Sequence, residues 1–308
     1  MGRARGYRRR AGAVVLAAVA MAACGASGSG GSRPSGGGGR PLVVATTTQL
    51  ADFTRVIGGD DLQVVGLLKP NVDAHEYEPS PADLDRISRA ELVVRNGLGL
   101  DAWVDQALKA TGTKATVVVA TAGVTPRLVD GEPDPHVWLD PRNAKVMVGD
   151  IATAVATVDA SHAAVFEARR AAYVAQLDAL DAEITGQLAT VTNRKVVTNH
   201  DAFGYYLDHY GLTFVGSVIP SFDTQAELSA SELSDLVAAI KAQGVKVVFA
   251  ETSLPPKAAA ALATEAGVKV VEGDEALYGD SLGPAGSGAD TYLGMMRHDT
   301  KTFVDNLS

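Results

Sequence analysis

Residues 42–67 read LVVATTTQLADFTRVIGGDDLQVVGL, and the alternation within this segment sets the architecture that we expect for the whole chain. Short apolar runs rich in Val and Leu stand at Leu42–Ala45 and Leu62–Leu67, and each has the length and composition of a buried strand. Between them, a helix-like stretch ends at Gly58-Gly59. A strand, a helix and a second strand in succession predict a parallel sheet covered by helices.

The same alternation continues through the chain in two sets of four strands. Val196-Val197-Thr198 leads through a short helix to Gly211, just as the first strand leads to Gly58-Gly59. The further strands are expected at Glu91–Val94, Ala115–Ala120, Lys195–Thr198, Leu212–Ser217, Val245–Ala250 and Val268–Glu272, and the helices of the second set at Asp201–Tyr210, Ala226–Gln243, Pro255–Ala266 and Asp290–Asn306. We therefore predict an α/β protein with two similar lobes, each a parallel sheet flanked by helices.

Two helices of the first set carry clear start signals. Ser80-Pro81-Ala82-Asp83 offers a capping Ser, a Pro at the first helical position and an acid at the third. Asp140-Pro141 repeats this arrangement. We expect helices to begin at both places.

A long helix is expected between the two lobes. Ala160–Thr190 is rich in Ala, Leu, Glu and Gln, contains no Pro, and has no Gly before Gly186. A helix of about 30 residues is about 45 Å long, which is enough to span a domain; the alternative is an ordinary surface helix. The predicted organisation is a first lobe at residues 41–158, a linking spine helix at 159–192 and a second lobe at 193–308.

The N-terminal segment has the pattern of a secretory signal. Arginines are followed by the uncharged run Ala11–Ala23, which is rich in Ala and Val. These arginines are Arg3, Arg5, Arg8, Arg9 and Arg10. Such a short helix cannot cross a hydrocarbon layer about 30 Å thick, so we interpret residues 1–23 as a signal peptide and expect an exported protein.

The residues around Cys24 predict a lipid anchor. Met21-Ala22-Ala23-Cys24-Gly25 resembles the lipobox of bacterial lipoproteins, although Met21 departs from the usual Leu; the alternative is an ordinary signal with an incidental thiol. Cys24 is the only Cys, so no intramolecular disulfide can form. Residues 24–40 predict a flexible Gly- and Ser-rich tether, with the folded part beginning near Pro41. We expect the protein to be held by lipid on the outer face of the bacterial cytoplasmic membrane.

The rest of the chain is acidic. The 308 residues hold 27 Lys and Arg against 36 Asp and Glu, and five of the basic residues lie in the predicted signal. Such a surface argues against nucleic acid as a partner, because the 22 remaining Lys and Arg are outnumbered by 36 Asp and Glu. It suits the binding of a cation.

Three of the six histidines lie in polar loops directly after expected strands. His75 follows the second strand, His136 the fourth, and His200 the first strand of the second lobe. The carboxyl ends of parallel strands face the crevice in which ligands bind, so these loops can converge in one cleft. The residues alone leave a metal site and solvated loop histidines as equal interpretations. The histidines expected to be ordinary helix residues are His162, His209 and His298.

Four short segments make the chain recognisable. They are HEYEPSP from His75, DPHVWLDP from Asp134, HDAFGYY from His200 and GDSL from Gly279. From Pro41 to the C-terminus the chain closely resembles the metal-binding lipoproteins of bacterial zinc and manganese ABC importers. The resemblance implies that one divalent metal ion binds in the cleft between two lobes and passes to a membrane permease driven by an ATPase.

The resemblance also implies the metal ligands. They are the imidazoles of His75, His136 and His200 and the carboxylate of Asp280. For Asp280 the alternative is a cap before the final helix, with another acid supplying the oxygen. The acids that could do so are Glu76, Glu251 and Asp274. The acids that either accept a histidine N–H and fix its tautomer or cap helices are Asp201, Asp134 and Glu78.

The ligand set favours zinc over manganese. Three neutral imidazoles with one carboxylate suit a tetrahedral zinc ion, whereas manganese prefers more oxygen donors. In manganese-selective relatives the position of His200 is usually a carboxylate, so we predict Zn²⁺, with Mn²⁺ as the alternative. Many zinc-binding members carry a His-rich loop before the second motif; Thr121–Pro135 contains no His, which argues against auxiliary zinc capture.

Two other classes of function compete with import. A zinc hydrolase would keep an open coordination position, but the chain has no HExxH helix and four protein ligands leave no vacancy. An adhesin or scaffold with a structural metal is the second competitor, and it would usually unfold without its ion. We therefore expect a monomeric binding protein and not an enzyme.

Overall fold

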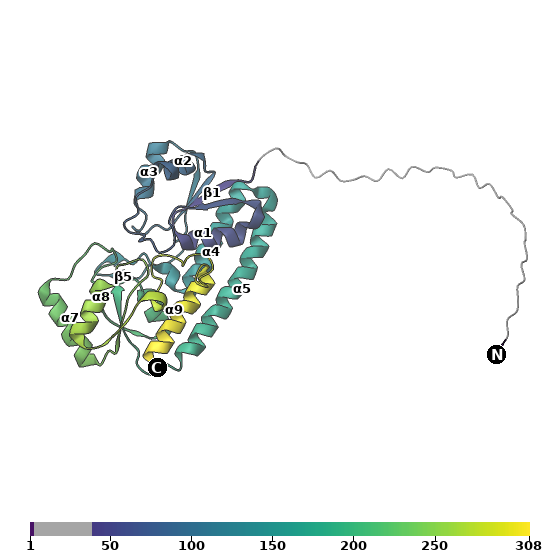
Figure 1. Cartoon of the computed structure of the whole chain (residues 1–308). Coiled ribbons are helices and arrows are strands. Elements are labelled where there is room, and N and C mark those ends of the chain that lie inside the picture. Colours follow the sequence, from purple (N-terminus) through teal and green to yellow (C-terminus); the bar gives the residue numbers. More distant parts are fainter. Residues whose placement is uncertain (3–38) are drawn as a thin grey trace, which may run out of the picture. The chain divides into compact units, whose positions relative to one another are not determined.

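The computed structural model describes residues 1–2 and 39–308. Nearly all of the predicted signal peptide, the anchor at Cys24 and most of the tether lie outside the described residues. The part from Gly39 to Ser308 forms one unit, which is coloured along the sequence in Figure 1. None of the described helices combines the length and the apolar composition that a membrane span needs.

Two four-stranded parallel sheets form the framework of this unit. The first consists of β1 (Leu42–Ala45), β2 (Gln63–Gly66), β3 (Leu92–Arg95) and β4 (Thr116–Val119), in the order β2-β1-β3-β4. The second consists of β7 (Lys195–His200), β8 (Thr213–Ile219), β9 (Val247–Phe249) and β10 (Lys269–Val271), in the order β10-β9-β7-β8. Read from its other edge, the second sheet repeats the strand order of the first. This repeat confirms the predicted α/β class with two similar lobes.

Helices cover both faces of each sheet (Figure 1). They are α1 (Thr48–Gly58), α2 (Pro81–Arg89), α3 (Trp103–Thr111), α4 (Pro141–Val158), α5 (Ala163–Leu188), α6 (Gly204–Tyr210), α7 (Ala230–Gln243), α8 (Lys257–Ala266) and α9 (Tyr292–Leu307). In the first sheet Val44 packs with α2 and α3, and its neighbour Val43 packs with α1 and α4. In the second, Val197 packs with α7 and α8, and Val196 with α6 and α9. Neighbouring residues of a strand point to opposite faces, so strands that are apolar throughout require helices on both sides.

The predicted long helix is present as α5, with 26 residues. A 3₁₀ turn at Ala160–His162 separates α5 from α4. α5 packs against α1 and α4 beside the first sheet and against α9 beside the second. One hydrophobic core therefore continues along α5 from the first sheet to the second.

A short hairpin, which was not predicted from the sequence, precedes the segment of His136. Its antiparallel strands are β5 (Leu128–Val129) and β6 (Glu132–Pro133). The connecting residues Asp130 and Gly131 have φ of 52° and 89°, as a tight two-residue hairpin turn requires. Strands of two residues are too short to show alternation, which is why the pattern gave no signal.

Candidate metal centre

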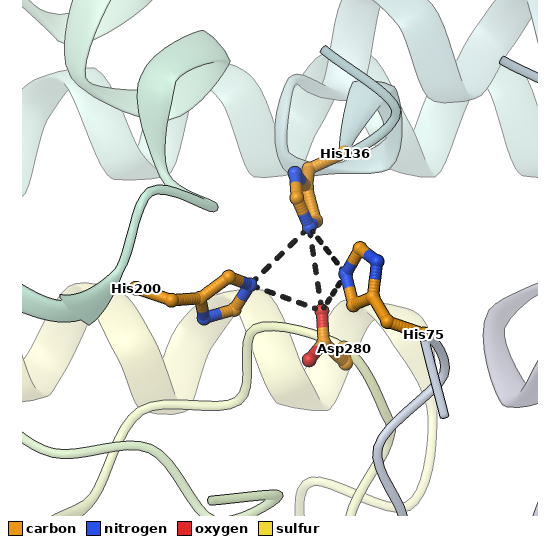
Figure 2. Close-up of side chains that lie close together, drawn as sticks. All are labelled: His75, His136, His200 and Asp280. Atoms are coloured by element: carbon orange, nitrogen blue, oxygen red, sulfur yellow. Dashed lines mark hydrogen bonds and ion pairs between the residues drawn. The ribbon is translucent and has the colours of Figure 1, made fainter. Parts of the chain in front are cut away.

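Four side chains from distant parts of the sequence point toward one another (Figure 2). Nε2 of His136 lies 3.1 Å from Nε2 of His75 and 3.3 Å from Nε2 of His200. Oδ1 of Asp280 lies 3.6, 3.4 and 3.5 Å from Nε2 of His75, His136 and His200, respectively. Across residues 1–2 and 39–308, this is the one group of three or more His, Cys, Asp or Glu residues arranged so that it could hold a metal ion. The structure thus brings together the four residues to which the resemblance pointed.

The topology explains why these four side chains meet. His75 lies in the loop between β2 and α2, and Ser80 caps α2 with a reciprocal capping box that ends this loop. His200 is the last residue of β7. His136 follows the hairpin, and Asp280 lies in the segment before α9. Loops at the carboxyl ends of the strands in both sheets therefore supply the site, as expected for open parallel sheets.

The spacing of the four atoms fits a tetrahedral ion. Zinc lies about 2.0–2.1 Å from imidazole nitrogen, which places the corners of a tetrahedron about 3.3 Å apart. Five of the six separations between these atoms are 3.1–3.6 Å, which is close to this value, and all four atoms lie within 4.8 Å of one another. Oδ1 of Asp280 is buried and accepts no hydrogen bond from any described residue. A buried carboxylate oxygen without a donor is costly, and a cation at the centre would satisfy it.

The tautomers of His136 and His200 also favour a metal ion between the rings. Nδ1 of His136 lies 2.8 Å from Oδ1 of Asp134, and Nδ1 of His200 lies 2.9 Å from Oε1 of Glu251. A carboxylate only accepts hydrogen bonds, so Nδ1 carries the proton in both rings and, in the neutral imidazoles, Nε2 offers a lone pair. Two lone pairs that face each other at 3.3 Å repel unless a proton or a metal ion lies between them.

The charges around the site attract a cation. Burial alone would lower the pKa of His136 and His200. The neighbouring carboxylates outweigh burial: Asp134 and Asp280 raise the pKa of His136. Glu251 and Asp280 raise the pKa of His200 well above its ordinary value. Burial raises the pKa of Asp280, but the neighbouring imidazoles outweigh it and hold this pKa well below its usual range. Without a metal ion the cluster therefore binds protons, and a metal must displace them.

Asp280 is held in place mainly from the first half of the chain. Nε1 of Trp138 donates to the carbonyl oxygen of Gly279 at 3.0 Å. The backbone N–H of Asn71 donates to Ser281, and the backbone N–H of Leu282 donates to Thr48, both at 2.8 Å. Thr291 caps α9, so the alternative of Asp280 as a helix cap is wrong.

The other acidic candidates lie outside the four-atom cluster. Glu251 contacts Nδ1 of His200, on the far side of that ring from the cluster. Glu76 lines a pocket of about 930 Å³ together with residues of the loop before α7. Asp201 is largely buried, and burial raises its pKa. Glu78 and Asp274 are exposed. Asp134, which was considered as the partner of a ring N–H, makes that contact with His136, and Glu251, which was considered as a ligand in place of Asp280, makes it with His200.

The remaining histidines bond elsewhere. His162 contacts Asp159 at 2.6 Å, and His209 contacts Asp181 at 2.7 Å. His298 bonds to the carbonyl oxygen of Ala276. They belong to helices or helical turns, as expected.

A buried support behind His136 was not predicted from the sequence. The side-chain amide of Asn96 donates to the carbonyl oxygen of Pro135 at 3.1 Å, directly before His136. Asp101 fixes this segment by accepting from the backbone N–H of Asn96 at 2.6 Å and from Thr46 at 2.8 Å. The available signal was a polar residue at the end of β3, where ligand-binding residues gather.

The chain matches known proteins over nearly its whole described length. Residues 43–306 match the family described as "Zinc-uptake complex component A periplasmic". Zinc-binding protein TroA of Treponema pallidum is 34% identical over 277 residues, which cover 87% of this chain and 89% of TroA. The manganese-binding lipoprotein MntA of Bacillus subtilis is 31% identical over 275 residues, which cover 86% of this chain and 89% of MntA. The iron-binding protein YfeA of Yersinia pestis is 28% identical and covers 85% of each chain.

The fold agrees with these matches. The structure of the periplasmic zinc-binding protein TroA from Treponema pallidum superimposes with a TM-score of 0.82 at 30% identity, over 88% of this chain and all of that one. These relatives are transport components and not enzymes. The chain therefore belongs to the zinc-uptake component A family, the metal-binding substrate-binding proteins of ABC importers.

Proposed function

We propose that this chain binds one zinc ion through His75, His136, His200 and Asp280 and delivers it to an ABC permease. The observation that carries the proposal is the close spacing of three imidazole nitrogens and one carboxylate oxygen: all four lie within 4.8 Å of one another, and five of their separations are 3.1–3.6 Å, as a tetrahedral zinc site requires. Nitrogen-rich tetrahedral sites suit zinc, whereas manganese favours more oxygen ligands. The relatives named above bind zinc, manganese or iron, so the choice of zinc rests on the donor set.

The charge balance supports a divalent ion. Asp134 is paired with the guanidinium of Arg127, 3.1 Å away, so its charge is already compensated. In the metal-bound site, where the imidazoles are neutral, Glu251 and Asp280 lie buried beside them and together supply two negative charges. A divalent cation neutralises both, which removes the penalty for burying uncompensated charge.

We also propose that the protein is exported and anchored by lipid. Residues 1–23 direct export, Cys24 carries lipid, and residues 24–40 tether the protein to the outer face of the cytoplasmic membrane. The lobes predicted at 41–158 and 193–308, joined by the helix at 159–192, hold the metal between them. One chain supplies the full ligand set, which supports a monomer.

Metal analysis tests the zinc proposal. Residues 39–308, purified without added metal, should hold one zinc per chain and keep it against a hundredfold excess of manganese. Manganese that displaces zinc under these conditions would contradict the assignment. Removing the ion with a chelator should leave a folded protein; loss of the fold would instead favour the structural role of a scaffold or adhesin.

Delivery requires a separate experiment. Zinc-loaded protein should stimulate the ATPase of its cognate permease in membrane vesicles more than the metal-free protein does. Equal stimulation by both forms would contradict delivery of the metal.

A further inference from the structure

Arg127 connects helix α6 to the imidazole of His136. Nη1 of Arg127 donates to Oδ2 of Asp134 at 3.1 Å, and Nε donates to Oδ2 of Asp208 on α6 at 3.1 Å. Asp134 is fully buried, and its Oδ1 accepts from the backbone N–H of His136 at 3.0 Å and from Nδ1 at 2.8 Å. A continuous chain of hydrogen bonds therefore runs from α6 through Arg127 and Asp134 to a ring of the metal cluster.

α6 also holds the backbone of the same segment. The hydroxyl of Tyr205 accepts from the backbone N–H of Arg127 at 2.8 Å and donates to the carbonyl oxygen of Asp134 at 2.9 Å. Gly204 leaves room for the guanidinium, because a Cβ at this position would lie 2.3 Å from Nη1 of Arg127. α6 begins four residues after His200. The helix that follows one imidazole thus holds the segment that precedes another.

We infer that Arg127 is a positioning residue of the metal site: from α6 it holds the carboxylate of Asp134, and thereby fixes the ring of His136 relative to His200. This inference rests on the metal-binding function proposed above. The partners of a ligating histidine fix its tautomer and orientation, and they influence metal affinity strongly.

Arg127 influences the metal site mainly through its contact with Asp134. The side chain of Asp208 is 69% exposed, so its ion pair with Arg127 contributes little. The carboxylate of Asp134 is buried, and without Arg127 its charge would lose its cationic partner. The planar guanidinium contacts two carboxylates at once, which the point charge of a lysine does not reproduce.

Three variants and a matched control test this role. Arg127→Gln removes the charge, and Arg127→Lys keeps it without the planar fork. Gly204→Ala retains the arginine but displaces its guanidinium. The control is Arg142→Gln, which removes a guanidinium from another buried carboxylate, that of Asp140 at the start of α4.

Each variant is measured in three ways. The zinc dissociation constant comes from competition with a chromogenic chelator. The visible absorption of Co²⁺ bound in place of zinc reports the geometry of the site. Thermal unfolding of the metal-free protein reports whether the variant is folded.

We expect Arg127→Gln to weaken zinc binding by about tenfold and to reduce the tetrahedral Co²⁺ bands, while the metal-free protein stays folded. Arg127→Lys should lose less zinc affinity and less of the tetrahedral Co²⁺ bands than Arg127→Gln does. Gly204→Ala should behave like Arg127→Gln, and the double variant should be no weaker than either single one, because both act through the same guanidinium. Arg142→Gln should leave the affinity and the spectrum unchanged.

A folded Arg127→Gln with wild-type affinity and spectrum would overturn the inference. Additive effects of Arg127→Gln and Gly204→Ala would do the same. If Arg127→Gln does not fold, Gly204→Ala decides the question, and a wild-type spectrum in that variant counts against the role. Wild-type zinc affinity in His136→Ala would overturn the proposed metal site itself, which separates the two failures.

Discussion

His136 and His200 are the two fully buried imidazoles of the site, and carboxylates hold them in the same way but with different charge. Each ring places Nδ1 within 2.9 Å of a buried carboxylate oxygen. Asp134, the partner of His136, is paired with Arg127. Glu251, the partner of His200, keeps its second oxygen without a hydrogen-bond partner in the described part of the chain.

This difference separates two tasks. Fixing a ring requires only a well-placed acceptor, and both carboxylates provide one. Compensating the charge of a metal ion requires a negative charge that no other cation has neutralised, and Glu251 provides it where Asp134 does not. Asp134 therefore only orients the ring of His136, whereas Glu251 orients the ring of His200 and also supplies negative charge for the metal ion.

The largest effect is expected from pH. The pKa of both imidazoles is raised in the metal-free protein, so protons compete with zinc as the pH falls through this raised value. From pH 7.5 to pH 5.5 the zinc affinity should fall by about two to three orders of magnitude. The pKa of His200 lies well above its ordinary value, so His200→Ala should flatten this dependence more than His136→Ala does. Competition titrations at each pH measure it, and an affinity that stays constant would contradict the three-imidazole site.

Removing a single imidazole should have the next largest effect. A zinc site worth about 10–16 kcal/mol over four ligands loses about 3 kcal/mol with one of them, or about a hundredfold in affinity. We expect this loss in His136→Ala and in His200→Ala, each still folded. The matched control is His209→Ala, whose ring bonds to Asp181 on α5 and should leave zinc affinity unchanged. Chelator competition measures all three, and wild-type affinity in both cluster variants would disprove the assignment.

The contacts of His136 with Asp134 and of His200 with Glu251 also differ in how far the sequence could predict them. Asp134 lies two residues before His136, so its contact with that ring was among the alternatives that the sequence offered. Glu251 lies 51 residues from His200, so no local pattern could pair it with the ring of that histidine. Only the pairing of β7 with β9 brings these two residues together.

The elements of the fold followed closely from local patterns, because buried parallel strands are continuous apolar runs and caps mark their helices. β1 was predicted to the residue, and α2 and α4 begin at the predicted caps. The hairpin before His136 and the buried support by Asn96 depend on contacts between distant segments, which no local pattern records.

Neutralising the carboxylate beside each ring should have a smaller effect than removing the ring. Glu251→Gln should weaken zinc binding by about thirtyfold, because it removes a charge that compensates the metal as well as a ring partner. Asp134→Asn should weaken it by about tenfold, because its charge is already paired with Arg127. Chelator competition on both variants tests this order, and a larger loss for Asp134→Asn would reverse the assignment of the two tasks.

The smallest expected effect concerns the stability of the metal-free protein. A histidine whose pKa is raised by folding stabilises the fold fully below its unfolded pKa of about 6.5, and this contribution disappears as the pH rises through the folded value. The pKa of His200 is raised further than that of His136, so the wild-type advantage over His200→Ala should shrink more between pH 6 and pH 8 than the advantage over His136→Ala. The difference should amount to a few degrees in melting temperature, since each kcal/mol corresponds to about 2–4 °C in a domain of this size class. Zinc reverses the trend, because it binds the deprotonated rings and stabilises more at higher pH. Thermal unfolding with chelator and with excess zinc measures both trends; a metal-free wild-type protein that gained stability over His200→Ala as the pH rose would show that the carboxylate of Glu251 does not hold a proton on that ring.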